Sequence, residues 1–304
     1  MRKLIRLLSV AALVVAAGCH YDNIRYGRID RDRVGICSWS WRLPMKGVAE
    51  EMEKAGVKGI QLALGPFIAP DERHGAAEGA ETLEFVTAKI ASGEWKLMST
   101  MVAAVGEDYT TLETIRKTGG IVPDQNWEAN KKIVSAGAKL TQELGCKYML
   151  MHAGFLDESD PVALAKYVER VSWMRDECRK YGVTLILESG QETAEDLAKF
   201  MAKVPGLGIN LDPANMILYG KGKPLEALRI LRPWIRQIHV KDARFTKVPG
   251  TWGEEVPWGD GEVGGKEFVK ALERCGFRGN YVVEREGGDD RPGDICRAVK
   301  SLTE

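Results

Sequence analysis

The feature that most constrains the fold is an alternation of short apolar runs with helix-like segments. It begins at Val34, repeats eight times and contains no linker-like stretch. Alternating strands and helices predict a parallel sheet, and right-handed crossovers through eight units close that sheet into a barrel. The sequence therefore predicts an α/β fold, a single (β/α)8 TIM barrel over residues 34–304. A doubly wound open sheet is the alternative, but the chain has neither GxGxxG after its first run nor a GxxxxGK[S/T] loop.

Length and charge agree with one barrel that acts on a small molecule. The chain has 304 residues, of which about 285 remain after a removable N-terminus, and a barrel of this type needs roughly 250. Its 43 basic and 43 acidic residues balance. A neutral protein has no broad positive field for a phosphate backbone, so nucleic acid is not an expected partner.

The N-terminus has the pattern of an export signal. Arg2, Lys3 and Arg6 precede a short apolar run that ends in Ala-Ala-Gly-Cys, which predicts a signal peptide over residues 1–18. The small residues before Cys19 resemble the lipobox of bacterial lipoproteins, in which the peptide is cut before an acylated cysteine. Lipidation at Cys19 and a polar tether over residues 19–33 are therefore expected. An ordinary secretory signal cut elsewhere is the alternative.

The resemblance implies a location and a partner. A lipid anchor on Cys19 would hold the protein on a bacterial membrane outside the cytoplasm. The residue after Cys19 is His20 rather than Asp, which favours the outer membrane facing the periplasm. The sequence leaves the oligomeric state open, including a homo-oligomer.

Five other cysteines show no CxxC spacing and favour buried apolar positions over a zinc knuckle. An odd number cannot all pair within one exported chain, and the sequence leaves their disulfide status open. They are Cys37, Cys146, Cys178, Cys275 and Cys296.

Four predicted strands end on side chains that bind metals. LILES ends on Glu188, GINLDP reaches Asp212, IRQIHVKDAR contains His239, one of four histidines in the chain, and YVVERE reaches Glu284. In a parallel barrel all carboxyl ends lie on one face, and neighbouring strands are about 5 Å apart. The four side chains are therefore expected to meet. Glu286 has the same parity as Glu284, and Glu284 is preferred because it directly ends the apolar run.

A divalent cation explains why three carboxylates and an imidazole would gather. The carboxylates would repel one another without compensation, and a cation bound by all four side chains removes that repulsion. One nitrogen with three carboxylates suits Mn²⁺ first, with Mg²⁺, Co²⁺ or Zn²⁺ as alternatives. For any one carboxylate, a helix cap or a salt bridge is the simpler explanation, so the prediction depends on the whole set.

These residues carry a family resemblance. The order Glu, Asp, His, Glu on the fifth to eighth strands resembles the xylose isomerase-like barrel superfamily, and within it the sugar isomerases and epimerases. HVKDA and the stretch from Gly259 to Glu284 resemble motifs of that family. The resemblance implies a metal that polarises a carbonyl and stabilises an enediolate. It also implies that Glu188 and Glu284 move protons while they bind the metal.

Other polar and aromatic residues are candidate substrate contacts. Lys241 would stabilise an oxyanion or form a salt bridge, His152 would bind a sugar hydroxyl or pack in the structure, and Arg244 is a weaker candidate. Tryptophans would form a wall for a sugar ring, with core packing as the alternative; they are Trp39, Trp252 and Trp258. Asp242 has the opposite parity to His239 and is expected to anchor a neighbouring loop or Arg244.

One departure from the family narrows the activity. Ketose 3-epimerases of this family carry histidine three residues after the sixth-strand aspartate, where this chain has Asn215. Asparagine binds a hydroxyl but cannot titrate near neutrality, which puts ketose 3-epimerase activity in doubt. An exported enzyme is expected to meet unphosphorylated sugars or keto-sugars.

Three other functions remain as alternatives. They are a keto-glycoside lyase or hydratase on the same site, a non-catalytic sugar-binding lipoprotein, and a metallohydrolase like endonuclease IV. The last is disfavoured because that family uses a histidine-rich three-zinc site.

Overall fold

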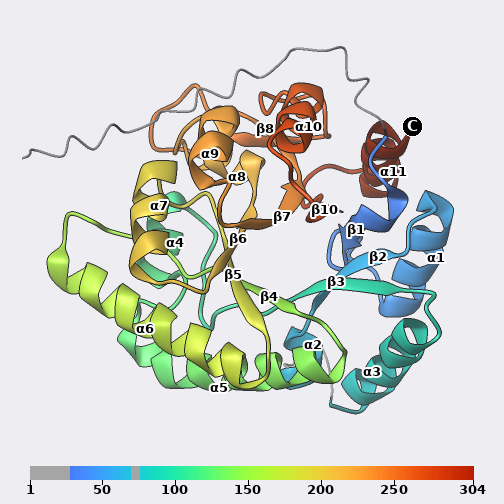
Figure 1. Ribbon diagram of the computed structural model, residues 1–304, viewed down its shortest axis with the longest axis horizontal. Helices are drawn as coiled ribbons and strands as arrows, with labels where there is room; N and C mark the ends of the chain where they lie inside the picture. The colour runs from blue at the N-terminus through green and yellow to red at the C-terminus, as the bar shows by residue number, and fades with distance from the viewer. Residues whose placement is uncertain (1–27, 70–75) are drawn as a thin grey trace, which may run out of the picture.

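Eight parallel strands close into a barrel with helices around its outside, as predicted (Figure 1). The computed structural model describes residues 28–69 and 76–304. Around the barrel the strands follow the order β1-β10-β7-β6-β5-β4-β3-β2. They are β1 (Val34–Cys37), β2 (Gly59–Ala63), β3 (Lys96–Met101), β4 (Tyr148–Met151), β5 (Thr184–Glu188), β6 (Gly208–Leu211), β7 (Ile235–Val240) and β10 (Asn280–Val283).

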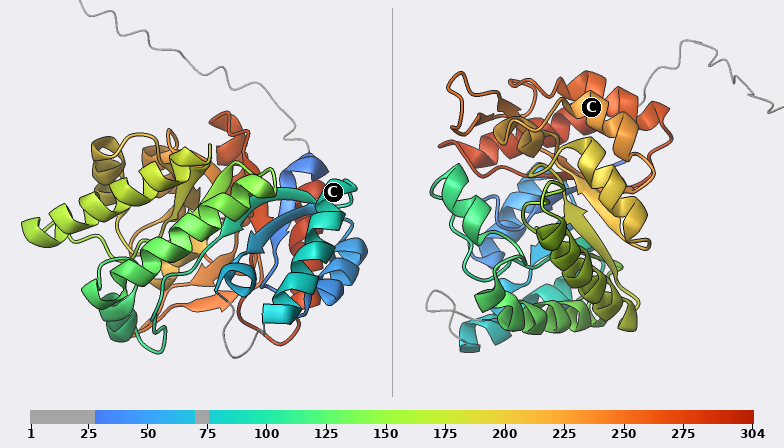
Figure 2. Two further views of the ribbon diagram at one scale, coloured as in Figure 1. Left: turned by 90° about the horizontal axis from the view of Figure 1, so that it is seen from below. Right: turned by 90° about the vertical axis from the view of Figure 1, so that its left-hand side faces the viewer.

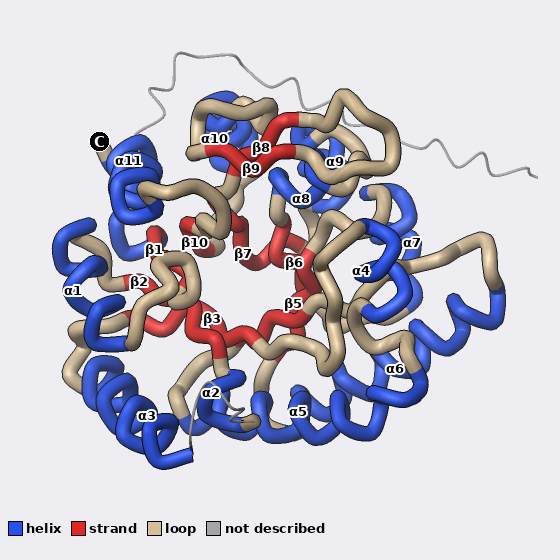
Figure 3. The backbone as a smooth tube through the Cα atoms, turned by 180° about the vertical axis from the view of Figure 1, so that it is seen from behind, coloured by secondary structure: helices blue, strands red, loops and turns tan. Residues whose placement is uncertain are grey.

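The helices form a ring around the closed sheet, as the view from behind shows (Figure 3). The two longest, α5 and α6, pack side by side on one flank (Figure 2). The helices are α1 (Met45–Ala55), α2 (Gly65–Ile68), α3 (Ala76–Ala91), α4 (Leu112–Thr118), α5 (Asp124–Glu143), α6 (Pro161–Lys180), α7 (Ala194–Lys203), α8 (Pro213–Leu218), α9 (Pro224–Leu231), α10 (Gly265–Arg274) and α11 (Arg291–Thr303). In the part of the chain that the model describes, no helix combines the length and apolarity that a bilayer crossing requires.

Local sequence explains where key helices begin. Helix α6 begins at Pro161, and the side chain of Asp160 accepts hydrogen bonds from the backbone amides of Val162 and Ala163. Helix α8 begins in the same way: Asp212 caps it by accepting from the amide of Asn215 at 2.8 Å. Both caps satisfy amides that have no partner inside the helix. The cap on α8 fixes the position of a predicted metal ligand.

The interior of the barrel is polar toward the carboxyl ends of its strands. Gln61, Ser99, Asn210 and Gln237 are completely buried there. The register shifts beside two of them, between Ile60 and Gln61 and between Ile209 and Asn210. Such bulges re-aim side chains and are frequent next to active sites. The sequence did not reveal this polar layer.

A short ribbon that the sequence did not predict follows β7. Strands β8 (Asp242–Arg244) and β9 (Glu254–Val256) pair antiparallel outside the barrel (Figure 3). The carboxylate of Asp242 accepts hydrogen bonds from the amides of Gly259, Gly261 and Val263. Asp242 thus anchors the loop before α10, as its strand parity predicted.

The first described residues pack against the barrel. The amide of Ile29 donates to Leu302 at 2.8 Å, and Arg33 donates to the carbonyl of Gly279 and pairs with Glu273. Residues 28–33, which the sequence analysis placed in the tether, therefore contact the fold. The expected signal peptide, Cys19 and most of the tether lie outside the described residues.

The five described cysteines are free thiols. Cys37, Cys146 and Cys178 are buried, Cys296 is half-buried and Cys275 is exposed. The expectation of buried apolar positions is met by three of the five.

Candidate metal centre

The four predicted ligands converge on one buried point at the carboxyl ends of four adjacent strands. Glu188 ends β5, Asp212 directly follows β6, His239 lies in β7, and Glu284 directly follows β10. Their ligand atoms all lie within 4.8 Å of one another. Nδ1 of His239 is 2.9 Å from Glu188, 3.4 Å from Asp212 and 3.2 Å from Glu284. Each of the four is at most 7% exposed.

The residues present fit a divalent cation. Carboxylates at this separation repel one another by roughly 4 kcal/mol per pair at an effective dielectric of about 20. Two buried atoms that face the cluster, Oδ2 of Asp212 and Nδ1 of His239, have no hydrogen-bond partner among the described residues. Buried polar atoms normally have partners, so orphaned acceptors beside three carboxylates indicate a site for a cation. The residues that would hold it are Glu188, Asp212, His239 and Glu284.

Gln61 fixes the orientation of the histidine. Nε2 of His239 lies 2.8 Å from Oε1 of Gln61, and the thiol of Cys37 donates to the same oxygen at 3.3 Å. Because an amide oxygen only accepts, this contact places the imidazole proton on Nε2 and leaves the Nδ1 lone pair toward the cluster. Sequence reasoning missed Gln61; the available signal was a glutamine in an otherwise apolar strand.

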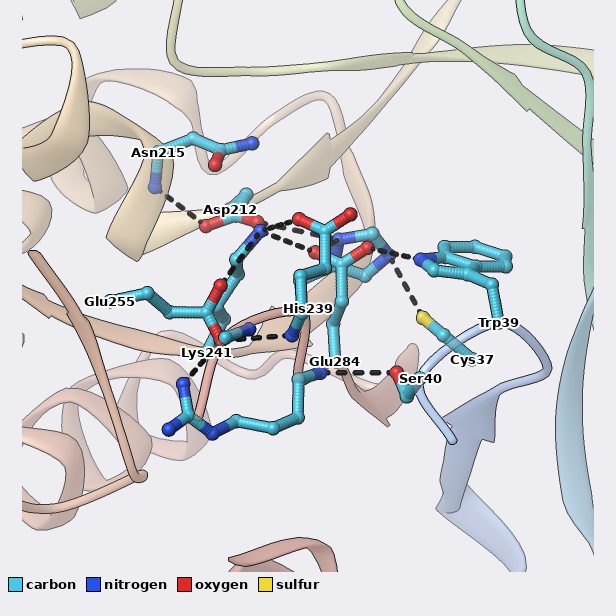
Figure 4. A network of polar contacts seen from close by, with 12 residues as sticks. Cys37, Trp39, Ser40, Asp212, Asn215, His239, Lys241, Glu255 and Glu284 are labelled. Carbon is cyan, nitrogen blue, oxygen red and sulfur yellow. Dashed lines mark hydrogen bonds and ion pairs between the residues drawn. The ribbon is translucent and has the colours of Figure 1, made fainter. Parts of the chain in front are cut away.

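The two glutamates have different surroundings. Glu188 accepts from the side-chain amides of Asn210 at 2.8 Å and Asn215 at 3.4 Å. Glu284 accepts from the indole of Trp39 at 2.8 Å and the ammonium of Lys241 at 3.0 Å. Neutral amides thus hold Glu188, and a cation holds Glu284 (Figure 4 shows the Glu284 side of the network).

These surroundings shift the pKa values of the two glutamates in opposite directions. Burial raises the pKa of Glu188 to about 7. Burial also opposes ionisation of Glu284. The charges of Lys241 and His239 outweigh this effect of burial and hold the pKa of the Glu284 carboxyl well below its usual range. Burial opposes the charge on His239, yet the carboxylates of Glu188 and Glu284 raise the pKa of the imidazole well above its usual value. Without a metal, the cluster therefore holds protons near neutral pH.

A cavity of about 360 Å³ opens above the cluster. Five of the predicted substrate contacts line this cavity: Trp39, His152, Asn215, Lys241 and Trp252. Burial lowers the pKa of His152 to about 4, so its imidazole is neutral, and its buried Nδ1 has no described partner. His152 can thus bind a ligand hydroxyl. Another cavity, of about 340 Å³, is lined by residues such as Tyr148, Ile235 and Gly279 and by none of the predicted site residues.

Lys241 is a buried, ion-paired lysine. It is 3% exposed and contacts Glu284 at 3.0 Å and Glu286 at 2.6 Å. Burial disfavours its charge, but these carboxylates outweigh that effect and raise the pKa of the ammonium well above its usual value. The sequence analysis gave Lys241 two alternative roles, a salt bridge or a contact with the substrate. The structure shows the salt bridges and also places Lys241 in the lining of the cavity. Glu286 meets Lys241 and not the metal cluster, in agreement with the preference for Glu284.

Two predicted substrate contacts do not reach the cavity. Arg244 is exposed in the β8–β9 ribbon, where it donates to the carbonyl of Asp260. Trp258 packs against Gly265 at the start of α10. Neither residue is among those that line the cavity, and their roles as substrate contacts stay predictions.

Three further polar residues, which the sequence analysis did not single out, line the cavity: Glu107, Tyr109 and Tyr219. Glu107 and Tyr109 belong to the segment between β3 and α4, and Tyr219 follows α8. Strand periodicity cannot predict the positions of these residues, because they lie in loops.

Comparison with known proteins identifies similar barrels. A family model described as a xylose isomerase-like TIM barrel matches residues 49–304. The crystal structure of a xylose isomerase domain protein from Planctomyces limnophilus is 30% identical, with a TM-score of 0.74, over 84% of this chain and 89% of that one. The structure of the 3-keto-D-glucoside 4-epimerase YcjR from Escherichia coli is 14% identical, with a TM-score of 0.64, over 89% of this chain and 98% of that one.

The name of one relative also refers to a sugar epimerase. SgbU from Escherichia coli strain K12, whose proposed activity is L-ribulose-5-phosphate 3-epimerase, is 25% identical over 169 residues. The match covers 52% of this chain and 58% of SgbU. This chain therefore spans little more than half the length of that relative.

Proposed function

The chain belongs to the xylose isomerase-like TIM barrel family, and from this premise we propose that it is a divalent-metal-dependent sugar isomerase or epimerase acting on an unphosphorylated sugar or keto-sugar. One observation carries the proposal. Four ligand side chains from adjacent strands meet at a buried point, and two of their atoms have no described partner there. The sugar epimerase names of YcjR and SgbU support the reaction class.

The ligand set suits Mn²⁺ first, with Mg²⁺, Co²⁺ and Zn²⁺ as alternatives. Held by Glu188, Asp212, His239 and Glu284, such an ion would supply Lewis-acid polarisation of a sugar carbonyl and would offset the negative charge that deprotonation of the neighbouring carbon develops. Gln61 keeps the imidazole of His239 in the orientation that binding requires.

The proton transfers fall to the two glutamates. Glu188 and Glu284 reach the cluster from β5 and β10, which β6 and β7 separate in the barrel. A sugar between them meets one carboxylate on each side, so one removes a proton from carbon and the other returns one. Lys241 keeps Glu284 ionised, and the indole of Trp39 fixes the other oxygen of that carboxylate.

The charge of the cavity favours an unphosphorylated substrate. Among the described residues that line it there is no arginine, and the single lysine, Lys241, is already paired with Glu284 and Glu286. Phosphate sites normally use free Arg or Lys side chains or backbone amides at a helix start. The four lining glutamates would repel a phosphate group instead.

Exchange of carbon-bound protons with solvent tests the reaction. The Mn²⁺-loaded protein, incubated in D2O with free sugars and 3-keto-glucosides, is expected to place deuterium beside the carbonyl of one of them, as NMR would show. Glu284→Gln is expected to lower the rate by about 100-fold or more, whereas Glu286→Gln, which removes the other partner of Lys241, changes it much less. No exchange into any sugar would contradict the proposal, and loss of an aglycone with the exchange would favour the lyase alternative.

We further propose that the protein is an exported lipoprotein anchored through Cys19 at the outer membrane, on the periplasmic side. The support is the sequence pattern of residues 1–19 alone. Cys19→Ala is expected to move the protein from the membrane fraction to the soluble fraction. Continued membrane association of this variant would contradict a lipid anchor.

A further inference from the structure

The cavity has an outer part that the proposed reaction does not use. The metal ligands at its inner end are at most 7% exposed, whereas Tyr109 is 46% exposed and the side chain of Glu286 is 53% exposed. Glu107, Tyr219 and Trp252 line the cavity and contact none of the four ligands in any hydrogen bond or ion pair that the described residues make. The cavity is therefore deeper than a single ring held at the metal centre requires.

Aromatic rings form one side of this outer part. The rings of Tyr219 and Trp252 meet edge to face, with centroids 4.9 Å apart, and the centroid of Phe155 lies 5.8 Å from that of Tyr219. These rings come from the loops after β4, β6 and β7, so they fix three loops relative to one another. Rigid aromatic faces beside polar groups are the usual surface for stacking a sugar ring.

A firmly held carboxylate, Glu107, also lines this outer part. Oε1 of Glu107 accepts from the amide of Gly120 at 2.9 Å, and Oε2 is near the hydroxyl of Tyr109 at 3.4 Å. The same loop is tied to α5, where the completely buried Asn130 accepts from the amide of Val105 at 2.8 Å. Glu107 is thus presented by a fixed loop.

Several groups on this rim can bind hydroxyls. The hydroxyl of Tyr219 accepts from Gln191 at 3.3 Å and donates to no described residue, so its proton is available. Burial raises the pKa of Glu107 to about 7, which lets the carboxyl group either accept or donate near neutral pH. Acceptors and donors beside an aromatic face suit a polyhydroxylated ring, and the surrounding carboxylates exclude an acidic one.

We propose that Glu107, Tyr219 and Trp252 form an outer subsite for a second, uncharged sugar ring, so that the substrate is a glycoside. The inner ring reaches the metal centre and the outer ring stacks on Trp252, with its hydroxyls on Tyr219 and Glu107. This inference rests on the proposed function for the identity of the inner ring.

Calorimetric titration of Mn²⁺-treated protein with cellobiose, maltose, lactose and trehalose, each compared with glucose, tests the subsite. At least one disaccharide is expected to bind about tenfold more tightly than glucose. Trp252→Ala and Glu107→Gln are expected to remove most of that advantage and to weaken the binding of glucose much less than that of the disaccharide. Phe245→Ala, an exposed aromatic outside the cavity, and Glu113→Gln, an exposed carboxylate on α4, are matched controls that should keep it.

The outcomes separate the two proposals because bound manganese is measured in the same samples. Absence of bound metal would contradict the proposed function. Bound metal without tighter binding of any of the four disaccharides would overturn the outer subsite. So would equal weakening of glucose and disaccharide in Trp252→Ala and Glu107→Gln, since that would place these residues in support of the whole cavity.

Discussion

The two halves of the barrel mouth differ in what they contribute. Strands β5, β6, β7 and β10 supply the three carboxylates and the imidazole of the cluster. With Glu107 at the rim as the exception, strands β1 to β4 and the loops after them supply mostly neutral or weakly basic groups: Cys37, Trp39, Gln61, Ser99 and His152. One half carries the charge of the cluster, and the other half orients His239 and Glu284.

This difference leaves the negative charge of the cluster only partly compensated by the surrounding side chains. Neutral hydrogen bonds from Gln61 and Trp39 fix the directions of His239 and Glu284 but do not cancel charge. Lys241 compensates one carboxylate and comes from the charged half itself. A bound cation would complete the balance, so substitutions in the two halves are expected to have different consequences.

Loss of a ligand in the charged half should have the largest effect. Asp212→Asn keeps an oxygen that can cap α8 but removes the charge beside the cluster. Bound metal is expected to fall from about one equivalent to a trace, and the exchange rate by about a thousandfold, since metal catalysis is worth several kcal/mol. The metal-free variant should be no less stable than the metal-free wild type, because one repelling carboxylate is gone.

Asp160→Asn is the matched control, because Asp160 caps α6 in the same way and lies outside the cluster. Metal analysis, exchange rates and thermal denaturation of both variants check the prediction. Equal metal binding in Asp212→Asn and the wild type would remove Asp212 from the ligand set and break the distinction between the halves.

Removal of an orienting group in the neutral half should have an intermediate effect. Gln61→Leu deprives Nε2 of His239 of its acceptor and is expected to weaken Mn²⁺ binding by about 10–100-fold. Gln237→Leu is the control: Gln237 is equally buried and accepts from Ser99, but it makes no hydrogen bond to a ligand among the described residues. If both variants weaken binding alike, Gln61 acts through packing alone.

The pH dependence of metal binding should distinguish the halves more finely. Glu188, in the charged half, has a pKa raised to about 7, and metal binding must displace its proton and that of His239. Affinity for Mn²⁺ is therefore expected to rise with pH up to about 7 and above, with proton release that calorimetry in two buffers would detect. Glu107, in the opposite half, also has a pKa of about 7 because of burial. Glu107→Gln should nevertheless leave the pH slope unchanged, and a flatter slope would show that the two halves are coupled.

The sequence predicted the barrel and the charged half because both follow strand periodicity. Glu188, Asp212, His239 and Glu284 each lie at the end of an apolar run, and parallel strands bring such ends together. The same parity argument predicted that Asp242 anchors a neighbouring loop or Arg244, and the apolar run before Glu284 favoured it over Glu286. Asn215, Trp39 and His152 were found because each closely follows a strand.

The rest depended on the path of loops and on the barrel interior. The positions of Arg244 and Trp258 outside the cavity lining could not be foreseen, because the ribbon of β8 and β9 has no strong sequence pattern. Glu107 and Tyr219 were missed for a related reason, since tertiary contacts and not periodicity place them. Gln61 was missed because a polar residue inside a strand becomes informative only when its partner across the barrel is known.

An anomalous-difference map from crystals grown with Mn²⁺ tests the central claim most directly. The account predicts one strong peak about 2.0–2.3 Å from Nδ1 of His239 and from carboxylate oxygens of Glu188, Asp212 and Glu284. No peak there, with manganese bound elsewhere or absent, would contradict a metal centre at the barrel mouth.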